Sequence, residues 1–404
     1  MAQARIGRRA LPDRPDLNHL KHQSRDLLKR GDAASLSDAQ FQIARSYGFP
    51  SWPRLKTFVD SFQEIAQLKA AIDSNDVQSV IATMSANPAL HSAPLGYGKN
   101  GPLTWVAECR VPWEPPRPER LKMAAWMIEH GSDVHQGGDG PLMRAALVDE
   151  RMPMMELLVS YGADVNARWG GYFPIIFAPC ETLEPASLAW LLQHGADPNS
   201  TGGRTGALRT ALDYVISTYS RSPNLTRCID ILRAAGGETR YRIRPVLDVM
   251  CDRVDDVRAQ IDAAPDLVHR RFPELEFGST GRRRLSLAGA ALIHVAAEYG
   301  AVRSAALLLD RGADVDTRAE VDANGVGGQT PIFHAVTQFD DFGYDVATLL
   351  IDRGADLATR ATVPGDYDRE HDVVVATPLG YALRFPGERN DKTIALLRSR
   401  GAAE

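Results

Sequence analysis

The sequence is poor in cysteine and lacks long apolar runs. Its 404 residues include four cysteines with no CxxC pair, which excludes a zinc knuckle or disulfide framework and predicts reduced, mostly buried thiols. No window approaches 18 uninterrupted apolar residues, so a membrane span is excluded. Residues 1–15 carry arginines but no apolar segment typical of a secretion signal. We therefore expect a cytoplasmic protein.

Motifs of catalysis and metal binding are also missing. The sequence contains no Gly-x-Ser-x-Gly elbow, phosphate-binding loop or His-Glu-x-x-His segment. His130 and His194 stand at the same place before a recurring glycine, where a histidine in the last turn of a helix favours the helix dipole. That repetition indicates a structural role. We predict no catalytic residue, no metal site, no cofactor and no enzymatic activity.

Positive charge is concentrated near the start of the chain. The net charge is -5, but residues 1–30 hold eight Lys or Arg against three Asp, which leaves the remainder at -10. An acidic body repels nucleic acid over most of its surface. We therefore expect the body of the protein to bind something other than a polyanion.

A repeated motif is the clearest positive feature of the chain. Each copy resembles Leu-Leu-x-x-Gly-Ala-Asp-x-Asn, in which Gly can take the left-handed conformation that ends a helix and Asp or Asn starts a turn. Each copy therefore predicts a helix end. The copies, complete or partial, are Met127–Asp133, Leu157–Asn166, Leu191–Asn199, Leu308–Asp316, Leu350–Leu357 and Leu396–Ala402.

A second motif, similar to Thr-Pro-Leu, lies upstream of these copies. Thr can cap a helix, and Pro suits the first helical position because its missing N–H is no loss there. Each occurrence therefore predicts a helix start. The occurrences are Gly101–Leu103, Gly140–Leu142, Phe173–Ile175, Thr210–Leu212, Thr330–Ile332 and Thr377–Leu379.

Helix, tight turn, helix, glycine stop and hairpin at a period near 33 residues resemble the ankyrin repeat, and we identify the chain as similar to bacterial ankyrin-repeat proteins. The resemblance covers about nine units between Ile65 and Gly401, some of them degenerate. It implies an all-α fold, an ankyrin-repeat solenoid of helix-turn-helix-hairpin units with an N-terminal helical cap. It also implies that His294, at the ankyrin histidine position, ties a turn together.

The segment before the repeats predicts three short helices, at Leu17–Lys29, at Asp38–Tyr47 and from Ser51 onward. It resembles a leader found ahead of many bacterial ankyrin arrays, and we interpret it as a polar cap over the first repeat. Its helix-Gly-helix spacing beside the basic arm also resembles a helix-turn-helix, so nucleic-acid binding stays an alternative. Pro50 and Pro53 bracket the supposed recognition helix and weaken that alternative.

We predict three segments along the chain. Residues 1–62 form a basic arm and helical cap, residues 63–270 a first block of repeats, and residues 271–404 a second block after a long insert at 270–290. Long spacings between glycine stops predict extended hairpins at 198–209, 270–290, 316–329 and 358–376.

The resemblance implies a monomeric adaptor or sequestering module that binds a protein or peptide on its concave hairpin and inner-helix face. Ankyrin surfaces vary, so the fold indicates the mode of action and not the target. An enzyme with a site near the 270–290 insert stays a further alternative.

The expected partner-binding residues follow from the ankyrin groove, position by position. Trp169 and Tyr172 are the strongest candidates, because they flank Gly170-Gly171 and because Trp, Tyr and Arg are enriched in interface hot spots. Packing between adjacent units is the alternative role for each aromatic residue. The full set is Arg168, Trp169, Tyr172, Arg204, Glu298, Tyr299, Gln338, Phe339, Phe342, Tyr344, Arg384 and Phe385.

Overall fold

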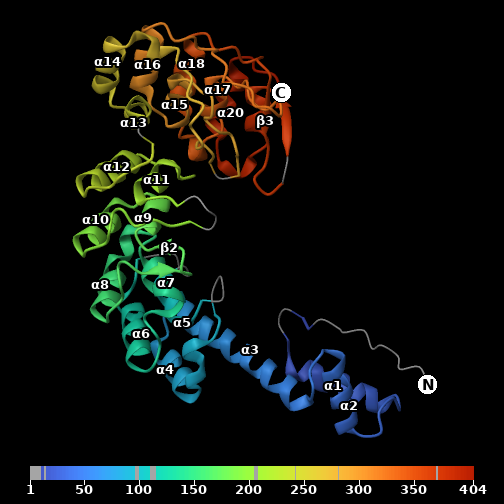
Figure 1. The fold of residues 1–404 in the computed structure, drawn as a ribbon. Coiled ribbons are helices and arrows are strands. Elements are labelled where there is room, and N and C mark those ends of the chain that lie inside the picture. Colours follow the sequence, from blue (N-terminus) through green and yellow to red (C-terminus); the bar gives the residue numbers. More distant parts are fainter. Residues whose placement is uncertain are drawn as a thin grey trace. The chain divides into compact units, whose positions relative to one another are not determined.

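The protein is mostly helical, with a few short strands (Figure 1). This confirms the predicted all-α class at its coarse level. The computed structural model describes residues 11–12, 15–95, 100–109, 115–203, 208–241, 243–280, 282–369 and 372–404. Across those ranges, no helix combines the length and apolar character that a bilayer crossing requires.

The chain forms two compact units. Unit 1 comprises Met1–Ala145 with Glu150–Asp164, and unit 2 comprises Ala146–Asp149 with Val165–Glu404. The border between the two units, at residues 145–150 and 164–165, coincides with neither predicted boundary, 62/63 or 270/271. The first of these boundaries falls inside one continuous helix, α3 (Trp52–Asp73).

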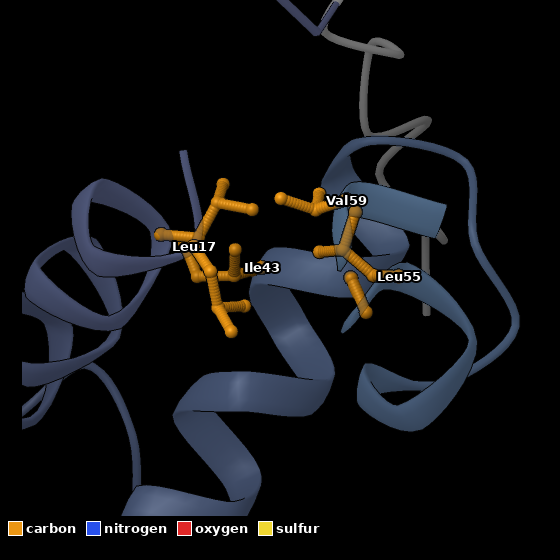
Figure 2. Packing of buried hydrophobic residues seen from close by; sticks show 6 residues of the cluster. Leu17, Ile43, Leu55 and Val59 are labelled. Atoms are coloured by element: carbon orange, nitrogen blue, oxygen red, sulfur yellow. The ribbon is translucent and has the colours of Figure 1, made fainter. Parts of the chain in front are cut away.

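Unit 1 begins with a small three-helix bundle of α1 (Leu17–Lys29), α2 (Leu36–Ser46) and the start of α3. Leu17, Ile43, Leu55 and Val59 pack together at its centre (Figure 2). The predicted first helix has the observed bounds, and the other two lie where the sequence placed them. Side chains cap α1 and α2, since Asp16 accepts from the His19 N–H and Ser35 from the Asp38 N–H.

Paired helices make up the rest of unit 1. Within the α7 span, Gly137, Gly138 and Asp139 have positive φ, so the regular helical turns follow the Gly140-Pro141 start that the motif predicted. The elements are α4 (Val77–Ala86), η1 (Pro88–Ser92), α5 (Pro102–Glu108), α6 (Pro118–Glu129), α7 (Gln136–Ala145), η3 (Asp149–Arg151, at the border of the two units) and α8 (Met152–Ser160).

The described residues of unit 2 form six helix pairs in chain order. Most first helices contact the first helix of the next pair, and most second helices contact the next second helix. The pairs are α9 (Phe177–Thr182) and α10 (Pro185–Gln193), α11 (Ala211–Ile216) and α12 (Asn224–Ala234), α13 (Arg244–Met250) and α14 (Val254–Ala263), α15 (Leu292–Glu298) and α16 (Val302–Asp310), α17 (Pro331–Ala335) and α18 (Tyr344–Asp352), and α19 (Pro378–Ala382) and α20 (Asp391–Ser399). Short 3-10 turns are η4 (Pro265–Val268), η5 (Phe339–Asp341) and η6 (Pro386–Glu388).

The second helix of most pairs ends in the same left-handed glycine turn. At Gly162, φ is +96°, its N–H donates to Val159 at 2.9 Å, and the Ala163 N–H donates to Leu158 at 3.0 Å. This is the Schellman arrangement, which satisfies carbonyls left free at a helix end. The predicted glycine stops at 131, 195, 312, 354 and 401 also have positive φ, and so does Gly236 after α12. The α14 helix ends without glycine and is followed by η4, and α4 is likewise followed by η1, so these two units differ from the others in how their second helix ends.

Short antiparallel ladders and bridges form the hairpins. β1 (Arg168–Trp169) pairs with β2 (Phe173–Pro174), and β3 (Ala361–Pro364) pairs with β4 (Val373–Ala376). The predicted helix start at Phe173–Ile175 is therefore wrong, because Phe173 and Pro174 are used as a strand and α9 begins at Phe177. Isolated bridges within 198–209, 270–290 and 316–329 agree with the extended hairpins predicted there.

Candidate functional site

The side chains of Asn166 and Asn199 each reach the glycine turn that follows in unit 2. Asn166 donates to the Gly195 carbonyl at 2.8 Å and accepts from the Asp197 N–H at 2.8 Å. Asn199 repeats this toward the following turn, donating to the Gly236 carbonyl at 3.0 Å. The last residue of the Leu-Leu-x-x-Gly-Ala-Asp-x-Asn motif therefore fixes the spacing between successive turns.

Aspartates at the turn inside one helix pair cap the second helix of the next pair. Asp252 accepts from the Ser304 N–H of α16 at 2.7 Å, and Asp341 accepts from the Thr393 N–H of α20 at 2.8 Å. Asp149 does the same for α10, accepting from the Ser187 N–H at 2.7 Å. Each carboxylate satisfies N–H groups that the first helical turn leaves free and complements the helix dipole.

The β1–β2 hairpin carries the two strongest partner-binding candidates. Trp169 and Tyr172 lie on either side of the Gly170-Gly171 turn with ring centroids 6.0 Å apart, and both are half-buried. Gly170 has a φ of +60°, and an added Cβ would lie 2.9 Å from the Tyr172 ring. The turn therefore requires glycine both for its backbone conformation and for the Tyr172 ring.

An aromatic row connects this hairpin to the core. Trp169 meets Phe173 edge-on at 6.2 Å, and Phe173 meets Phe177 at 5.6 Å and Tyr214 at 5.9 Å. Burial, followed by the nearby Glu181 carboxylate, raises the pKa of Tyr214 above its usual value. The hairpin is thus held by rings that continue into a fully buried Phe177.

A cluster of buried charges surrounds Glu298, the last residue of α15. Its Oε1 accepts from Arg221 at 2.7 Å and from Arg283 at 2.8 Å, and its Oε2 lies 2.7 Å from Nδ1 of His334. All four side chains are 0% exposed. The four come from the α11–α12 loop, the 270–290 insert, α15 and α17, so the cluster ties distant segments of unit 2 together.

Both arginines of the Glu298 cluster make further contacts besides their ion pairs with Glu298. The Arg221 guanidinium stacks over the Tyr299 ring at 4.4 Å. Arg283 also donates to the Gly278 carbonyl at 3.2 Å and to the Thr280 hydroxyl at 3.1 Å. The insert therefore folds around its own arginine and brings it to Glu298.

The electrostatics of the Glu298 cluster fix its protonation. Burial raises the pKa of Glu298, but Arg283 and Arg221 and the His334 hydrogen bond more than offset this, so the pKa is lowered to about 2. Burial lowers the pKa of His334, against the opposing effect of Glu298. At neutral pH the cluster is therefore an ionised carboxylate, two guanidinium groups and a neutral imidazole.

His294 ties two backbone segments, as the ankyrin resemblance implied. Its Nδ1 accepts from the Ala291 N–H at 3.2 Å, so Nε2 carries the proton and donates to the Gln329 carbonyl at 3.1 Å. Burial, with a smaller effect of His334, lowers the pKa of His294 to about 3. His130 and His194 each bond the carbonyl four residues earlier through Nδ1 and stack on a tryptophan, which is consistent with a structural role.

The Glu298 cluster could in principle orient a histidine base, because a carboxylate holds one nitrogen of His334. Its side chains are closed to solvent, however, so a substrate has no path to them without movement of the insert. In the part of the chain that the structure describes, no three His, Cys, Asp or Glu side chains are grouped so as to hold a metal ion. The arrangement favours a structural role, in which Arg283 holds the 270–290 insert against Glu298 of α15, over a catalytic one.

Four predicted partner-binding residues are buried, and this contradicts their expected exposure. Glu298 is buried because the α11–α12 loop and the 270–290 insert bring Arg221 and Arg283 to the end of α15, and Gln338 is buried and donates to the His334 carbonyl at 2.7 Å. Tyr299 lies beneath Arg221 and donates to the Ile216 carbonyl. Phe385 packs against Tyr381 with ring centroids 5.3 Å apart.

The other candidates are more accessible. Arg168 is exposed and donates to the Thr201 carbonyl, and Arg384 is exposed in an ion pair with Asp372 at 2.9 Å. Three half-buried aromatics, Phe339, Phe342 and Tyr344, lie at η5 and the start of α18. Arg204 and most of the basic arm, residues 1–10 and 13–14, lie outside the described residues.

Sequence reasoning missed Arg221 and Arg283 as partners of Glu298. Arg283 was visible as part of Arg282-Arg283-Arg284, but such a run usually indicates a solvated surface. Arg221 is 77 positions from Glu298, and no local pattern connects them. The capping aspartates were missed for the same reason, since each acts on the next helix pair.

Of the six exposed large apolar side chains described in unit 2, five lie on its hairpins and the sixth, Tyr219, lies in the α11–α12 loop. The five on the hairpins are Leu208, Val321, Tyr367, Val373 and Val375, and they lie at 198–209, 316–329 and 358–376.

In comparisons with known proteins, no family model matches the chain and no curated protein matches its sequence. The ankyrin interpretation therefore stays a prediction that depends on residues and geometry.

Proposed function

We propose that this chain is an ankyrin-type repeat array that binds a protein or peptide through the hairpins of unit 2, without catalysis. The exposed apolar side chains on those hairpins carry the proposal, because five of the six that are described in unit 2 lie on hairpins and an apolar surface exposed in this way is available to a partner. We expect the protein to act as a cytoplasmic monomer that presents these hairpins to a partner.

The repeated turns support the scaffold part of the proposal. Recurrent Schellman turns, the Asn166 and Asn199 bridges and the cross-pair aspartate caps all reproduce one geometry along the chain. A repeat array buries its apolar faces against neighbouring units and leaves its hairpins free for variation. The hairpins are therefore the segments on which a binding specificity can change without loss of the fold.

Trp169 and Tyr172 are the proposed anchor of the interface. Their rings flank a turn whose left-handed backbone requires glycine, and Trp169 also packs against Phe173 of the aromatic row. Rigid aromatic side chains lose little conformational entropy on binding, which suits them as hot spots.

The test compares affinity capture from nuclease-treated lysate of the source organism by the full chain and by a Trp169→Ala, Tyr172→Ala double variant. The double variant should weaken binding of the captured protein at least about thirtyfold. Phe41→Ala, which removes an exposed ring from unit 1, is the matched control and should bind as the full chain does. Equal retention by the double variant, with unchanged circular dichroism, would contradict the anchor assignment.

A further inference from the structure

The β3–β4 hairpin has one filled edge and one open edge. On the filled side, the Gly327 N–H donates to the Thr362 carbonyl of β3 at 2.7 Å, and Gly327 forms a bridge with Thr362. No described residue pairs with β4 from the other side. The chain therefore pairs Gly327 with the outer edge of β3 and pairs no described residue with the outer edge of β4.

The register of the hairpin shows which backbone groups face the open edge. The Gly365 N–H donates to the Asp372 carbonyl at 2.7 Å, and antiparallel pairs alternate between bonded and non-bonded. The Val363–Val374 pair is then bonded, while Pro364–Val373 and Thr362–Val375 are not. The N–H and C=O groups of Val373 and Val375 therefore point away from β3, toward the open edge.

The side chains of this edge are apolar and uncharged. Val373 is 46% exposed and Val375 is 59% exposed, and the strand continues with Val374 and Ala376. Proteins usually protect an exposed edge with a charge, a proline or a bulge. β4 has no charged residue or proline along its four residues, so it is open to strand addition.

We propose that β4 binds an extended segment of a protein partner as an added strand, with apolar side chains at alternate positions of that segment. The inference rests on the proposed function and specifies its binding mode at this hairpin. Main-chain hydrogen bonds to Val373 and Val375 would supply affinity, and their exposed side chains would select alternating apolar residues.

An extended segment fits this edge better than a second copy of the chain does. Two four-residue strands bury far less than the roughly 1,200 Å² of a stable dimer interface. An extended segment needs only the backbone groups of the edge and the residues beside it. Gly327 makes a backbone hydrogen bond of this kind to Thr362 at the outer edge of β3. The occupant is therefore a flexible or strand-forming segment of another protein.

The probe is a synthetic peptide of alternating Thr and Val, nine residues long with a Lys at each end, and the protein is the full chain labelled with ¹⁵N-valine. Binding should slow hydrogen exchange at the Val373 and Val375 amides, while the already bonded Val374 amide should not change. Val375→Pro should weaken peptide binding at least about tenfold, since it removes an outward N–H and obstructs the edge.

The controls separate the edge from the hairpin itself. Pro364 already occupies a non-bonded position in β3, so proline at Val375 is compatible with the β3–β4 ladder. Val375→Thr keeps the outward N–H and should bind the peptide within about threefold of the full chain. The same peptide with its central Val replaced by Pro should protect neither amide.

Unprotected Val373 and Val375 amides at saturating peptide, or equal binding by Val375→Pro, would overturn the inference. A concentration-dependent dimer that Val375→Pro abolishes would show that the occupant is a second copy and would overturn it as well. A captured partner lost by the Trp169→Ala, Tyr172→Ala variant but unaffected by Val375→Pro would refute this inference alone. The proposed function would be refuted separately, by a captured protein that the Trp169→Ala, Tyr172→Ala variant retains as well as the full chain does.

Discussion

Replacing Glu298 by Gln should destabilise unit 2 strongly. The substitution keeps the size of the side chain but removes the only carboxylate that Arg221 and Arg283 share in the described ion pairs. Two guanidinium groups at 0% side-chain exposure would then lose their ion pairs with Glu298. Breaking a buried ion pair by removing one partner costs about 3–5 kcal/mol.

The pKa of Glu298 gives a second route to the same magnitude. Its fall from 4.5 to about 2 corresponds to roughly 3 kcal/mol of stability above pH 4.5. Because the folded pKa is the lower one, this contribution is lost as the pH falls from 4.5 toward 2. The two estimates agree, so we expect Glu298→Gln to cost about 3 kcal/mol at neutral pH.

Hydrogen exchange measured by mass spectrometry on peptides from 292–310 tests this locally. The free energy of opening in these peptides should fall by about 3 kcal/mol in Glu298→Gln. Glu276→Gln is the control, because its ion pair with Arg240 is exposed and should contribute less than about 0.5 kcal/mol. Adding Arg283→Met should recover part of the loss, since it removes one of the two buried charges that pair with Glu298. A loss below about 1 kcal/mol for Glu298→Gln would refute the reasoning.

Three further outcomes are expected. Lowering the pH from 7.5 to 5 should cost roughly 2 kcal/mol through His294, because burial lowers its pKa to about 3 and only the unfolded chain takes up a proton below about 6.5; unchanged urea midpoints would contradict this. Gly162→Ala should cost about 1 kcal/mol in thermal melts, because φ is +96° and no atom obstructs the added Cβ, whereas Gly387→Ala should be nearly neutral. Equal losses would show that the left-handed turn is not the cause. Asn199→Ala should cost about 1 kcal/mol by loss of its hydrogen bonds to the next turn, and an unchanged unfolding midpoint would count against that bridge.

Helix ends were predictable because their chemistry is local. Thr210 forms a capping box with Asp213, and Thr377 caps α19, both at starts that the Thr-Pro-Leu motif marked. The glycine stops have the expected left-handed φ. At Phe173–Pro174 the motif failed, because the same residue types also suit a short strand next to a tight turn.

The surroundings of the candidate site were not predictable for a different reason. Which side chains remain exposed depends on where the 270–290 insert folds back, and Arg283 reaches Glu298 only through that path. Trp169 and Tyr172 could be placed beside their turn because the glycines lie next to them in sequence. The burial of Tyr299 required knowledge of Arg221, which no spacing rule connects to it.

The direction of the aspartate caps has a consequence for how the protein is made. Asp149, Asp252 and Asp341 each precede in sequence the helix whose first N–H groups they bind. A ribosome therefore releases every cap before the helix that needs it. Assembly in this order lets α10, α16 and α20 form against a carboxylate that is already present, whereas unfolding that begins at the C-terminal pair leaves the other two caps intact. Folding that proceeds from the N-terminal side and unfolding that begins at the C-terminal side are thus the easier directions for unit 2.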